Sequence, residues 1–387
     1  MMKSLPKKLI EKMTTREQQN SLRALPEAVS GIDFSSNDYL GFSISEQLKE
    51  RINRKLAASK FTNGATGSRL LTGNHTLYNE AEVVISNFHK SETALIFNSG
   101  YDANIGFFSC VPQKGDIILY DAYIHASIRD GISMSLAKSW KFKHNNIQDL
   151  ERKIKRSYNS NTSIYVVTES VFSMDGDSPP LKEIIDCCEQ YNCLLVVDEA
   201  HALGVIGNEG KGLLGAWSLQ DKVFASIVTF GKALGGHGAA ILGAEELKQY
   251  LVNFARSLIY TTGLPPHSVA GIIAGYQLLE QHTLPLKILQ EHIVYFKEQV
   301  KKYHLEAYFI ASDSAIHCAL IPGVNNVKEI ANQLVMHGYN VKPILPPTIP
   351  AGGERLRFCL HSYNSKEEIA SVLQLMATFV THKFKNG

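Results

Sequence analysis

The feature that most constrains the fold is an alternation of apolar runs and amphipathic helical segments between about residues 76 and 245. The apolar runs have the length of strands, and stretches such as "LKEIIDCCEQYN" (181–192) separate them. Apolar strands joined by helices are typical of a parallel sheet buried on both faces. The sequence therefore predicts an α/β fold, a mostly parallel sheet covered by helices on both faces, with strands at 93–100, 116–121, 163–170, 193–201 and 225–232.

Every one of these predicted strands finishes in polar or reactive residues. The strand ends are Asn98–Ser99, Asp121, Glu169–Ser170, Asp198–Glu199–His201 and Lys232. In open α/β sheets, ligands bind beyond the carboxyl ends of the strands. Five polar ends at one edge of the sheet therefore predict a ligand site there.

The remainder of the chain predicts a second, smaller domain. A long helical pattern, "VAGIIAGYQLLEQH" (269–282), follows the sheet region, and helices alternate with short strands from about residue 285. We expect an N-terminal helix and connecting segment at 1–45, a large ligand-binding α/β domain at 46–270, and a small C-terminal α+β domain at 271–387.

Composition excludes several classes of function. The 387 residues are 44% hydrophobic and 20% charged, and the formal net charge of +2 is spread without a basic stripe. This charge pattern gives no electrostatic footprint for nucleic acid. No run approaches the roughly 20 apolar residues of a membrane span.

Six cysteines form no CxxC pair, and we expect free thiols in a reducing cytoplasm, with zinc binding the remote alternative.

The N-terminal stretch "MMKSLPKKLIEKMTTREQQ" is basic but lacks the apolar core of a signal peptide. It also carries Glu11 and Glu17, which a transit peptide disfavours. We expect an amphipathic helix that packs on the body of the protein or on a partner subunit.

A lysine lies among glycines in "VTFGKALGGHGAA" (228–240). Lys232 is either a solvated lysine on a turn or an active amine in a pocket, where the four glycines of this stretch let the backbone approach a ligand. A lysine nucleophile must be neutral to attack a carbonyl, and desolvation favours the neutral form. The other motifs favour the interpretation of Lys232 as an active amine in a pocket.

The stretch "LLVVDEAHALGVIG" (194–207) closes an apolar strand with Asp198. This aspartate could cap the next helix, or it could hold a pyridinium nitrogen in its protonated form. A lysine that forms a Schiff base together with an aspartate on the ring nitrogen is how proteins bind pyridoxal phosphate. His201 could then reach the phenolic oxygen of the ring, although a lone histidine here is otherwise a capping or core residue.

A phosphate site is predicted where "FNSGYDANIG" (97–106) passes from a strand into a helix. The N–H groups at a helix start bind phosphate, and the hydroxyl of Thr229 could add a hydrogen bond. His125 could stack on the cofactor ring or be an ordinary loop histidine. In "TESVFSMDGD" (168–177), a plain turn explains the DGD but does not require Ser173.

The stretch "PPTIPAGGERLR" (346–357) places Arg355 and Arg357 on alternate residues of a strand. We expect them to face opposite ways, one into the cleft and the other in a surface ion pair. Arginine suits bidentate binding of a carboxylate.

These motifs resemble, in order, those of the α-oxoamine synthases, which are fold-type-I pyridoxal-phosphate enzymes. The resemblance runs from about residue 20 to 365 and includes "SSNDYLGFS" (35–43) and "YTTGLPP" (260–266). It implies that this chain is a pyridoxal-phosphate-dependent acyltransferase. Among the members, the chain most resembles the one that condenses L-alanine with a pimeloyl thioester in biotin synthesis.

The resemblance also implies roles for individual residues. Lys232 would hold the cofactor covalently and later move protons, and His125 would stack on the ring. The remaining cofactor-binding residues would be Gly100, Tyr101, Ser173, Asp198, His201 and Thr229, together with Thr261 and Thr262 from the neighbouring subunit of an obligate homodimer. Substrate contacts would come from Arg23, His125, Thr348 and Arg357, with Arg357 on the amino-acid carboxylate.

The implied reaction removes the Cα proton of the amino acid, joins the carbanion to an acyl thioester carried by coenzyme A or an acyl carrier protein, and releases CO₂. Many such synthases have an arginine before the two prolines, whereas this chain has Leu345. The loop "FTNGATGSRLLTGNH" (61–75) would line the entrance for the acyl chain. The alternatives are glycine C-acetyltransferase, 5-aminolevulinate synthase, serine palmitoyltransferase, an aminotransferase, and a cofactor-free partner subunit, which Lys232 disfavours.

Overall fold

The structure is a computed structural model that describes residues 5–25, 31–58, 62–157 and 162–385. Contacts divide the chain into a larger unit (37–173 and 177–290) and a smaller unit (1–36, 174–176 and 291–387). We describe each unit by itself. These units are defined by contacts, so the functional division into 1–45, 46–270 and 271–387 stays a prediction.

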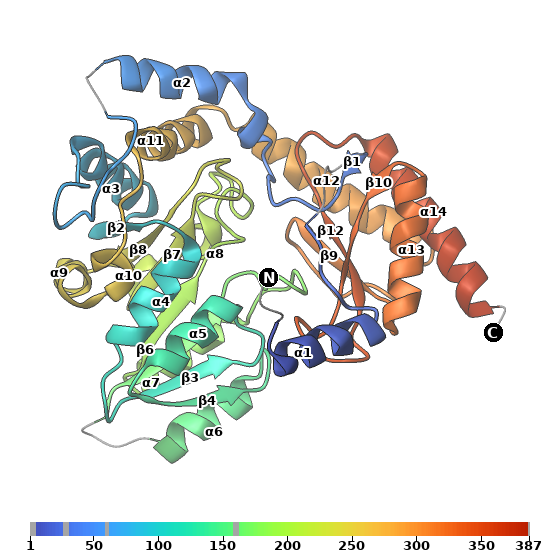
Figure 1. Cartoon of the computed structure of the whole chain (residues 1–387), viewed down its shortest axis with the longest axis horizontal. Coiled ribbons are helices and arrows are strands. Elements are labelled where there is room, and N and C mark those ends of the chain that lie inside the picture. Colours follow the sequence, from blue (N-terminus) through green and yellow to red (C-terminus); the bar gives the residue numbers. More distant parts are fainter. Residues whose placement is uncertain (1–4, 26–30, 59–61, 158–161, 386–387) are drawn as a thin grey trace. The chain divides into compact units, whose positions relative to one another are not determined.

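The larger unit is built on a seven-stranded sheet in the order β2-β8-β7-β6-β5-β3-β4 (Figure 1). Strands β7, β6, β5, β3 and β4 run parallel, and β8 runs antiparallel to both β2 and β7. The predicted mostly parallel sheet is therefore confirmed. Its strands are β2 (Thr93–Phe97), β3 (Ile117–Asp121), β4 (Lys138–Phe142), β5 (Ile164–Glu169), β6 (Leu194–Asp198), β7 (Ala225–Thr229) and β8 (Ala239–Gly243).

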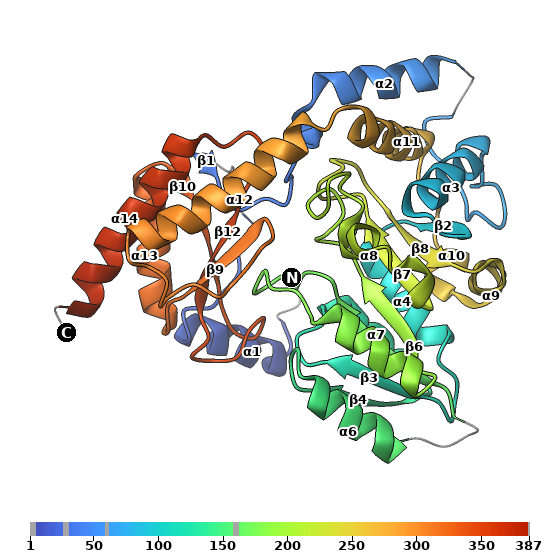
Figure 2. The same cartoon turned by 180° about the vertical axis from the view of Figure 1, so that it is seen from behind.

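Helices cover both faces of this sheet, because alternate side chains of each strand enter two separate cores. Ile118 packs with Phe107 and Ile128 in one core, whereas Leu119 packs with Leu150 and Ile184 in the other. Figures 1 and 2 show the two faces from opposite sides. The helices of this unit are α2 (Glu46–Ala57), α3 (Thr76–His89), α4 (Gly100–Cys110), α5 (Ala126–Met134), α6 (Ile147–Ser157), α7 (Leu181–Gln190), α8 (Gly212–Trp217), α9 (Glu245–Phe254), α10 (Arg256–Ile259) and α11 (Pro266–Gln281).

Two strands of the sheet were not predicted. β4 is an edge strand whose sequence, KSWKF, is largely exposed, so it lacks an apolar run. β8 begins directly after the glycine loop that follows β7. β7 itself ends at Thr229, three residues before Lys232, because the N–H of Phe230 bonds the carbonyl of Gly238 and starts a tight loop.

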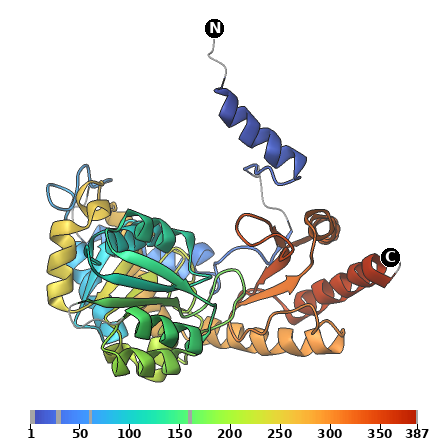
Figure 3. The same ribbon diagram turned by 90° about the horizontal axis from the view of Figure 1, so that it is seen from below.

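The smaller unit contains a three-stranded antiparallel sheet in the order β11-β12-β9, and β1 pairs in parallel with β10. Phe296 of α12 packs its ring against those of Phe309 and Phe358. This mixture of short strands and helices confirms the predicted α+β part (Figure 3). Its elements are α1 (Lys7–Gln18), β1 (Ile32–Asp33), β9 (Ile316–Leu320), α13 (Val324–Met336), β10 (Tyr339–Asn340), β11 (Lys342–Ile344), β12 (Arg355–Cys359) and α14 (Lys366–Lys385), and α12 (Leu284–Lys302) begins in the larger unit.

The predicted N-terminal helix forms as α1, but none of its side chains is buried. Packing of this helix on the body of the protein is therefore not observed, and packing on a partner subunit stays a prediction. The six cysteines are free thiols. Within the described part of the chain, no helix combines the length and the apolar character that crossing a membrane requires.

Candidate active site

A cavity of about 190 Å³ opens at the carboxyl ends of the central strands of the larger unit. The strands β5, β6 and β7 end there, and the helices α4 and α5 begin there. This is the edge at which the polar strand ends predicted a ligand site. The cavity is lined by Gly100, Tyr101, Asn104, His125, Ser127, Glu169, Asp198, Ala200, His201, Ile227, Thr229 and Lys232.

Asp198 is the last residue of β6, and its side chain is buried. The side-chain amide of Asn104 donates to Oδ2 at 3.0 Å, and the N–H of Ala200 donates to Oδ1 at 2.9 Å. Both donors are uncharged, whereas a buried carboxylate is stabilised by a cationic partner. A protonated pyridine nitrogen in the cavity would supply that positive charge. The alternative that Asp198 caps the next helix is wrong, because α8 begins only at Gly212.

His125 is connected to Asp198 through two hydrogen-bonded side chains. Asn104 Nδ2 also donates to Ser127 Oγ at 2.9 Å, and Ser127 Oγ lies 2.7 Å from His125 Nδ1. The backbone N–H of Ser127 points at the same Nδ1 at 3.3 Å. Since a backbone N–H can only donate, Nδ1 is an acceptor and the proton of the neutral ring lies on Nε2. The imidazole therefore enters the cavity with a fixed tautomer.

Burial supports this neutral form of His125. Desolvation lowers the pKa of His125, and the charge of Lys232 lowers it further, while the Asp198 carboxylate acts in the opposite direction. A neutral imidazole suits the stacking position that the sequence predicts, because it adds no second positive charge beside a protonated ring nitrogen.

Glu169, at the end of β5, brings a second buried carboxyl group to the cavity. Desolvation raises its pKa well above the usual value, as does the Asp198 carboxylate, and the Lys232 ammonium partly offsets both. Glu169 also accepts a hydrogen bond from the backbone N–H of His125. Through this hydrogen bond, Glu169 holds the loop that carries His125.

Lys232 lies in the loop between β7 and β8 and borders the cavity. The N–H of Gly235 bonds the carbonyl of Lys232 at 2.9 Å, which closes a tight turn. A Cβ on Gly235 would lie 2.3 Å from the backbone nitrogen of Ser43, and the φ of Gly235 is +59°. Gly235 thus allows the loop to pack closely against the chain itself. The predicted close approach of this glycine-rich loop to a ligand stays a prediction.

His201 follows Asp198 in a tight turn and is buried. Its Nδ1 lies 2.7 Å from the hydroxyl of Tyr39, a residue of the "SSNDYLGFS" motif. Tyr39 is fully buried, so this contact fixes the imidazole plane. The structure therefore brings His201 to the same cavity as Asp198 and Lys232.

The beginning of α4 offers a place for a phosphate. Ser99 caps this helix by accepting from the N–H of Asp102 at 3.0 Å, and the first N–H groups of a helix have no partner within it. A Cβ on Gly100 would lie 3.6 Å from Thr229 Oγ1, so this hydroxyl faces the first turn. Tyr101 also borders the cavity, and its hydroxyl donates to Asp130 at 2.6 Å. The residues present therefore fit pyridoxal phosphate at both its ring and its phosphate.

Three predicted cofactor residues do not line this cavity. Ser173 is buried in the turn that follows β5. Thr261 and Thr262 are held by the side chain of Asn98, which donates to Thr261 Oγ1 at 3.1 Å and to the carbonyl of Thr262 at 2.6 Å. The predicted reach of these two threonines toward a neighbouring subunit remains a prediction.

The predicted substrate residues other than His125 belong to the smaller unit. Arg23 donates to Thr348 Oγ1 at 3.1 Å, and both side chains are exposed. Arg357 is buried on β12, where its guanidinium donates to Cys359 Sγ at 2.9 Å. Their contacts with substrate stay predictions.

Two expectations about the arginines of β12 are wrong. Arg355 pairs with Asp175 as an ion pair, but it is buried and not on the surface. Arg355 and Arg357 also do not face opposite ways, because residues two apart in a regular strand lie on the same face.

The sequence interpretation missed Asn104, Ser127 and Tyr39 and gave Glu169 no role beyond a strand end. Asn104 lies four residues after Gly100, so both are on one face of α4. Ser127 lies two residues after His125 and shares its helix start. These spacings were the only signals in the sequence that could have pointed to Asn104 and Ser127. Their hydrogen-bond partners lie far away along the chain.

Comparisons with known proteins agree with this geometry. The family model for class I and II aminotransferases matches residues 29–374. An 8-amino-7-oxononanoate synthase from Emericella nidulans is 38% identical over 98% of this chain and 96% of its own length. A crystal structure of 8-amino-7-oxononanoate synthase from Francisella tularensis has a TM-score of 0.78 at 30% identity, covering 92% of this chain and 99% of its own. A serine palmitoyltransferase from S. paucimobilis, with a bound PLP–myriocin aldimine, has a TM-score of 0.88 at 25% identity and covers 97% of both chains.

Proposed function

Because the chain belongs to the class I and II aminotransferase family and, within it, to the 8-amino-7-oxononanoate synthases, we propose that it condenses L-alanine with a pimeloyl thioester. The product would be 8-amino-7-oxononanoate, an intermediate of biotin synthesis. The observation that carries the proposal is the convergence of Lys232 and Asp198 on one cavity at the end of β6 and β7.

The enzyme is a pyridoxal-phosphate-dependent acyltransferase of the α-oxoamine synthase type. When bound, the cofactor supplies an electron sink for a carbanion at Cα of the amino acid. In our proposal, Asp198 would hold the proton of the pyridine nitrogen, which would make the ring a better acceptor of electrons. His201 would bind the phenolic oxygen, and the first turn of α4 together with Thr229 would bind the phosphate.

Lys232 is the residue that moves the proton. Its amine would hold the cofactor in the absence of substrate and, as a free amine, would remove the proton from Cα of the amino acid as a general base. Asp198 and Glu169 lie around the same cavity, where the charge of Lys232 partly offsets the raised pKa of Glu169.

His125 lines the cavity and would pack on the cofactor ring and orient the substrate. Its neutral tautomer, with the proton on Nε2, leaves one N–H donor on the imidazole. We propose that this donor bonds the thioester carbonyl when the carbanion attacks it, so that negative charge on the oxygen is stabilised. Arg357 would bind the amino-acid carboxylate, which leaves as CO₂ after the condensation.

The proposal is tested by the visible spectrum of the purified protein, loaded with pyridoxal phosphate, on addition of L-alanine and then pimeloyl-CoA. We expect a coloured protein whose absorption shifts with alanine and a further band that appears and decays only with the pimeloyl thioester. Glycine with acetyl-CoA and serine with palmitoyl-CoA are the control pairs. A full response to either control pair would assign the chain to that sister activity.

The variant Lys232→Ala tests the assignment of the proton carrier. We expect turnover to fall by about 10²- to 10⁴-fold, because a positioned general base is lost. Borohydride should attach the cofactor covalently to the wild-type protein and not to the variant. A variant that turns over at the wild-type rate would refute the role of Lys232.

A further inference from the structure

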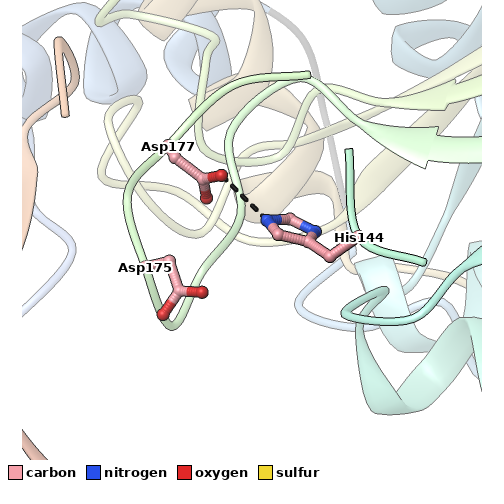
Figure 4. A group of neighbouring side chains, drawn as sticks. All are labelled: His144, Asp175 and Asp177. Atoms are coloured by element: carbon pink, nitrogen blue, oxygen red, sulfur yellow. Dashed lines mark hydrogen bonds and ion pairs between the residues drawn. The ribbon is translucent and has the colours of Figure 1, made fainter. Parts of the chain in front are cut away.

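A second histidine of the larger unit is held between two carboxylates outside the cavity. His144 Nδ1 lies 2.8 Å from Asp121 Oδ1, and its Nε2 lies 2.8 Å from Asp177 Oδ2. Figure 4 shows the second of these contacts, with the ring of His144 turned toward Asp177. Neither carboxylate belongs to the residues assigned to cofactor or substrate. The role of this group is therefore unaccounted for by the proposed reaction.

Two aromatic rings also pack against the ring of His144. The ring of Tyr123 stacks on it with centroids 4.2 Å apart, and Phe172 meets it edge-on at 4.5 Å. Its side chain is 19% exposed, and that of Asp121 is 1% exposed. The geometry is therefore fixed by packing as well as by hydrogen bonds.

Each ring nitrogen lies 2.8 Å from a carboxylate oxygen, and the side-chain amide of Asn145 lies 3.2 Å from Nε2. The doubly protonated, cationic ring can donate to both carboxylates. Burial lowers the pKa of His144, but the hydrogen bonds and charges of Asp121 and Asp177 outweigh this effect and raise the pKa to about 9. This occupation of both nitrogens also argues against a metal ion on His144, since a metal requires an unprotonated nitrogen. Asp175, in the smaller unit, pairs with Arg355 of the same unit.

The neighbouring Asn145 forms hydrogen bonds to the same two carboxylates, Asp121 and Asp177. Its backbone N–H donates to Asp121 Oδ2 at 2.8 Å, and its side-chain amide donates to Asp177 Oδ2 at 2.7 Å. We call Asp121, His144, Asn145 and Asp177 the His144 clamp. Each carboxylate of the clamp therefore receives hydrogen bonds from two consecutive residues.

The clamp joins the two loops that carry His125 and Ser173. Asp121 ends β3 and accepts from the N–H of Tyr123 at 2.8 Å, so it shapes the turn that leads to His125. Asp177 closes the loop after β5, where its carbonyl accepts from the N–H of Phe172 at 3.0 Å, next to Ser173. Charge-assisted hydrogen bonds of this kind are about twice as strong as neutral ones.

We propose that His144 is a positioning residue, which holds the loop of His125 and the loop of Ser173 in the geometry that receives pyridoxal phosphate. The inference rests on the proposed function, because it takes the loop of His125 to be part of the cofactor site; Ser173 itself does not line the cavity. In this proposal His144 acts through His125, and His144 itself does not line the cavity.

The test compares cofactor affinity in His144→Gln, Asp177→Asn and the double variant. Pyridoxal phosphate is titrated into each apoprotein, and the absorption of the bound cofactor is recorded. We expect each single variant to raise the dissociation constant by about tenfold or more, because a charged, buried hydrogen-bond partner is lost. The double variant should have a dissociation constant no higher than that of the single variant that binds the cofactor less tightly, because the two residues act as a unit. His337→Gln, at an exposed histidine of the smaller unit, is the matched control and should remain within about twofold of wild type.

Two outcomes would overturn the inference, and they are distinguishable. If the wild-type protein binds cofactor and the variants bind it equally well, His144 does not position the site, even where the melting temperature falls. If the wild-type protein itself binds no pyridoxal phosphate, the proposed function fails and the positioning role fails with it. Should His144→Gln not fold, Asp177→Asn decides the question by the same titration.

Discussion

At the scale of the residue, His125 illustrates how a side chain acquires a defined chemical state. The ring is neutral because it is desolvated, and its tautomer is set because the N–H of Ser127 points at Nδ1. Asn104 links this serine to Asp198, which lies 94 residues further along the chain. The protonation and tautomer of this imidazole thus depend on residues of α5, α4 and β6, and not on its own loop alone.

His144 leads to a prediction for the pH dependence of stability at the same scale. Its pKa is raised from 6.5 to about 9 in the folded protein, so its contribution is fully present below pH 6.5 and is lost as the pH rises through 9. We expect His144→Gln to be less stable than wild type at about pH 6. The difference should be smaller at about pH 10 by on the order of 3 kcal/mol.

Urea unfolding of both proteins across this pH range measures the difference. Only the difference between the two proteins is informative, because other buried groups titrate as well. A stability difference that is the same at both pH values would contradict a charged His144.

At the scale of the element, the close approach of α4 and α5 sets the site. Gly131 of α5 faces the backbone of α4, and a Cβ there would lie 2.8 Å from the carbonyl oxygen of Asn104. α5 starts directly after His125, and α4 carries Asn104. The distance between two helices therefore controls the hydrogen bonds that connect His125 to Asp198.

We expect Gly131→Ala to destabilise the protein by about 1–3 kcal/mol, because the added methyl group must push the two helices apart. The same change should weaken binding of pyridoxal phosphate, since Asn104 moves with the backbone. Thermal unfolding and cofactor titration measure the two effects.

Gly271→Ala is the matched control in another helix. A Cβ at this position would meet Ile52 at an ordinary 3.6 Å, so we expect it to be neutral or stabilising by up to about 1 kcal/mol. Equal effects of the two substitutions would refute the importance of the α4–α5 contact.

At the scale of the whole molecule, the predicted assembly is a homodimer with shared sites. Thr261 and Thr262 lie at the carboxyl end of β2, beside Asn98, and do not line the cavity of their own chain. This placement agrees with a role at the site of a second copy. The isologous symmetry of a dimer would then give each of two sites residues from both chains.

Mixing two inactive proteins tests this assembly. A Lys232→Ala protein and a Thr261→Ala/Thr262→Ala protein, unfolded together and refolded, should recover about one quarter of the wild-type activity. Half of the randomly formed dimers would be mixed, and one of their two sites would be intact. Sedimentation should give a mass about twice the 42.9 kDa of one chain.

Each variant refolded alone is the control for this mixing. Recovery in neither the mixture nor the controls would place the two threonines within the site of their own subunit. A mass equal to that of one chain would contradict the dimer altogether.

What the sequence by itself determined is the class of fold and the edge that carries the site. The apolar runs that became β3, β5 and β6 are buried on both faces, so their hydrophobic pattern was readable without any neighbour. Lys232 and Asp198 could be paired because Asp198 ends β6 and Lys232 follows the carboxyl end of the parallel strand β7. These signals are local in the chain or follow from the order of its elements.

Only the tertiary structure decided the features that depend on contacts across the chain. β4 and β8 lack a distinctive apolar run and are strands because of what they pair with. The raised pKa of Glu169 needs burial and a second carboxylate, and the His144 clamp needs Asp121 and Asp177 to meet. Desolvation and hydrogen bonding act over a few ångströms in space, and spacing along the sequence does not report such distances.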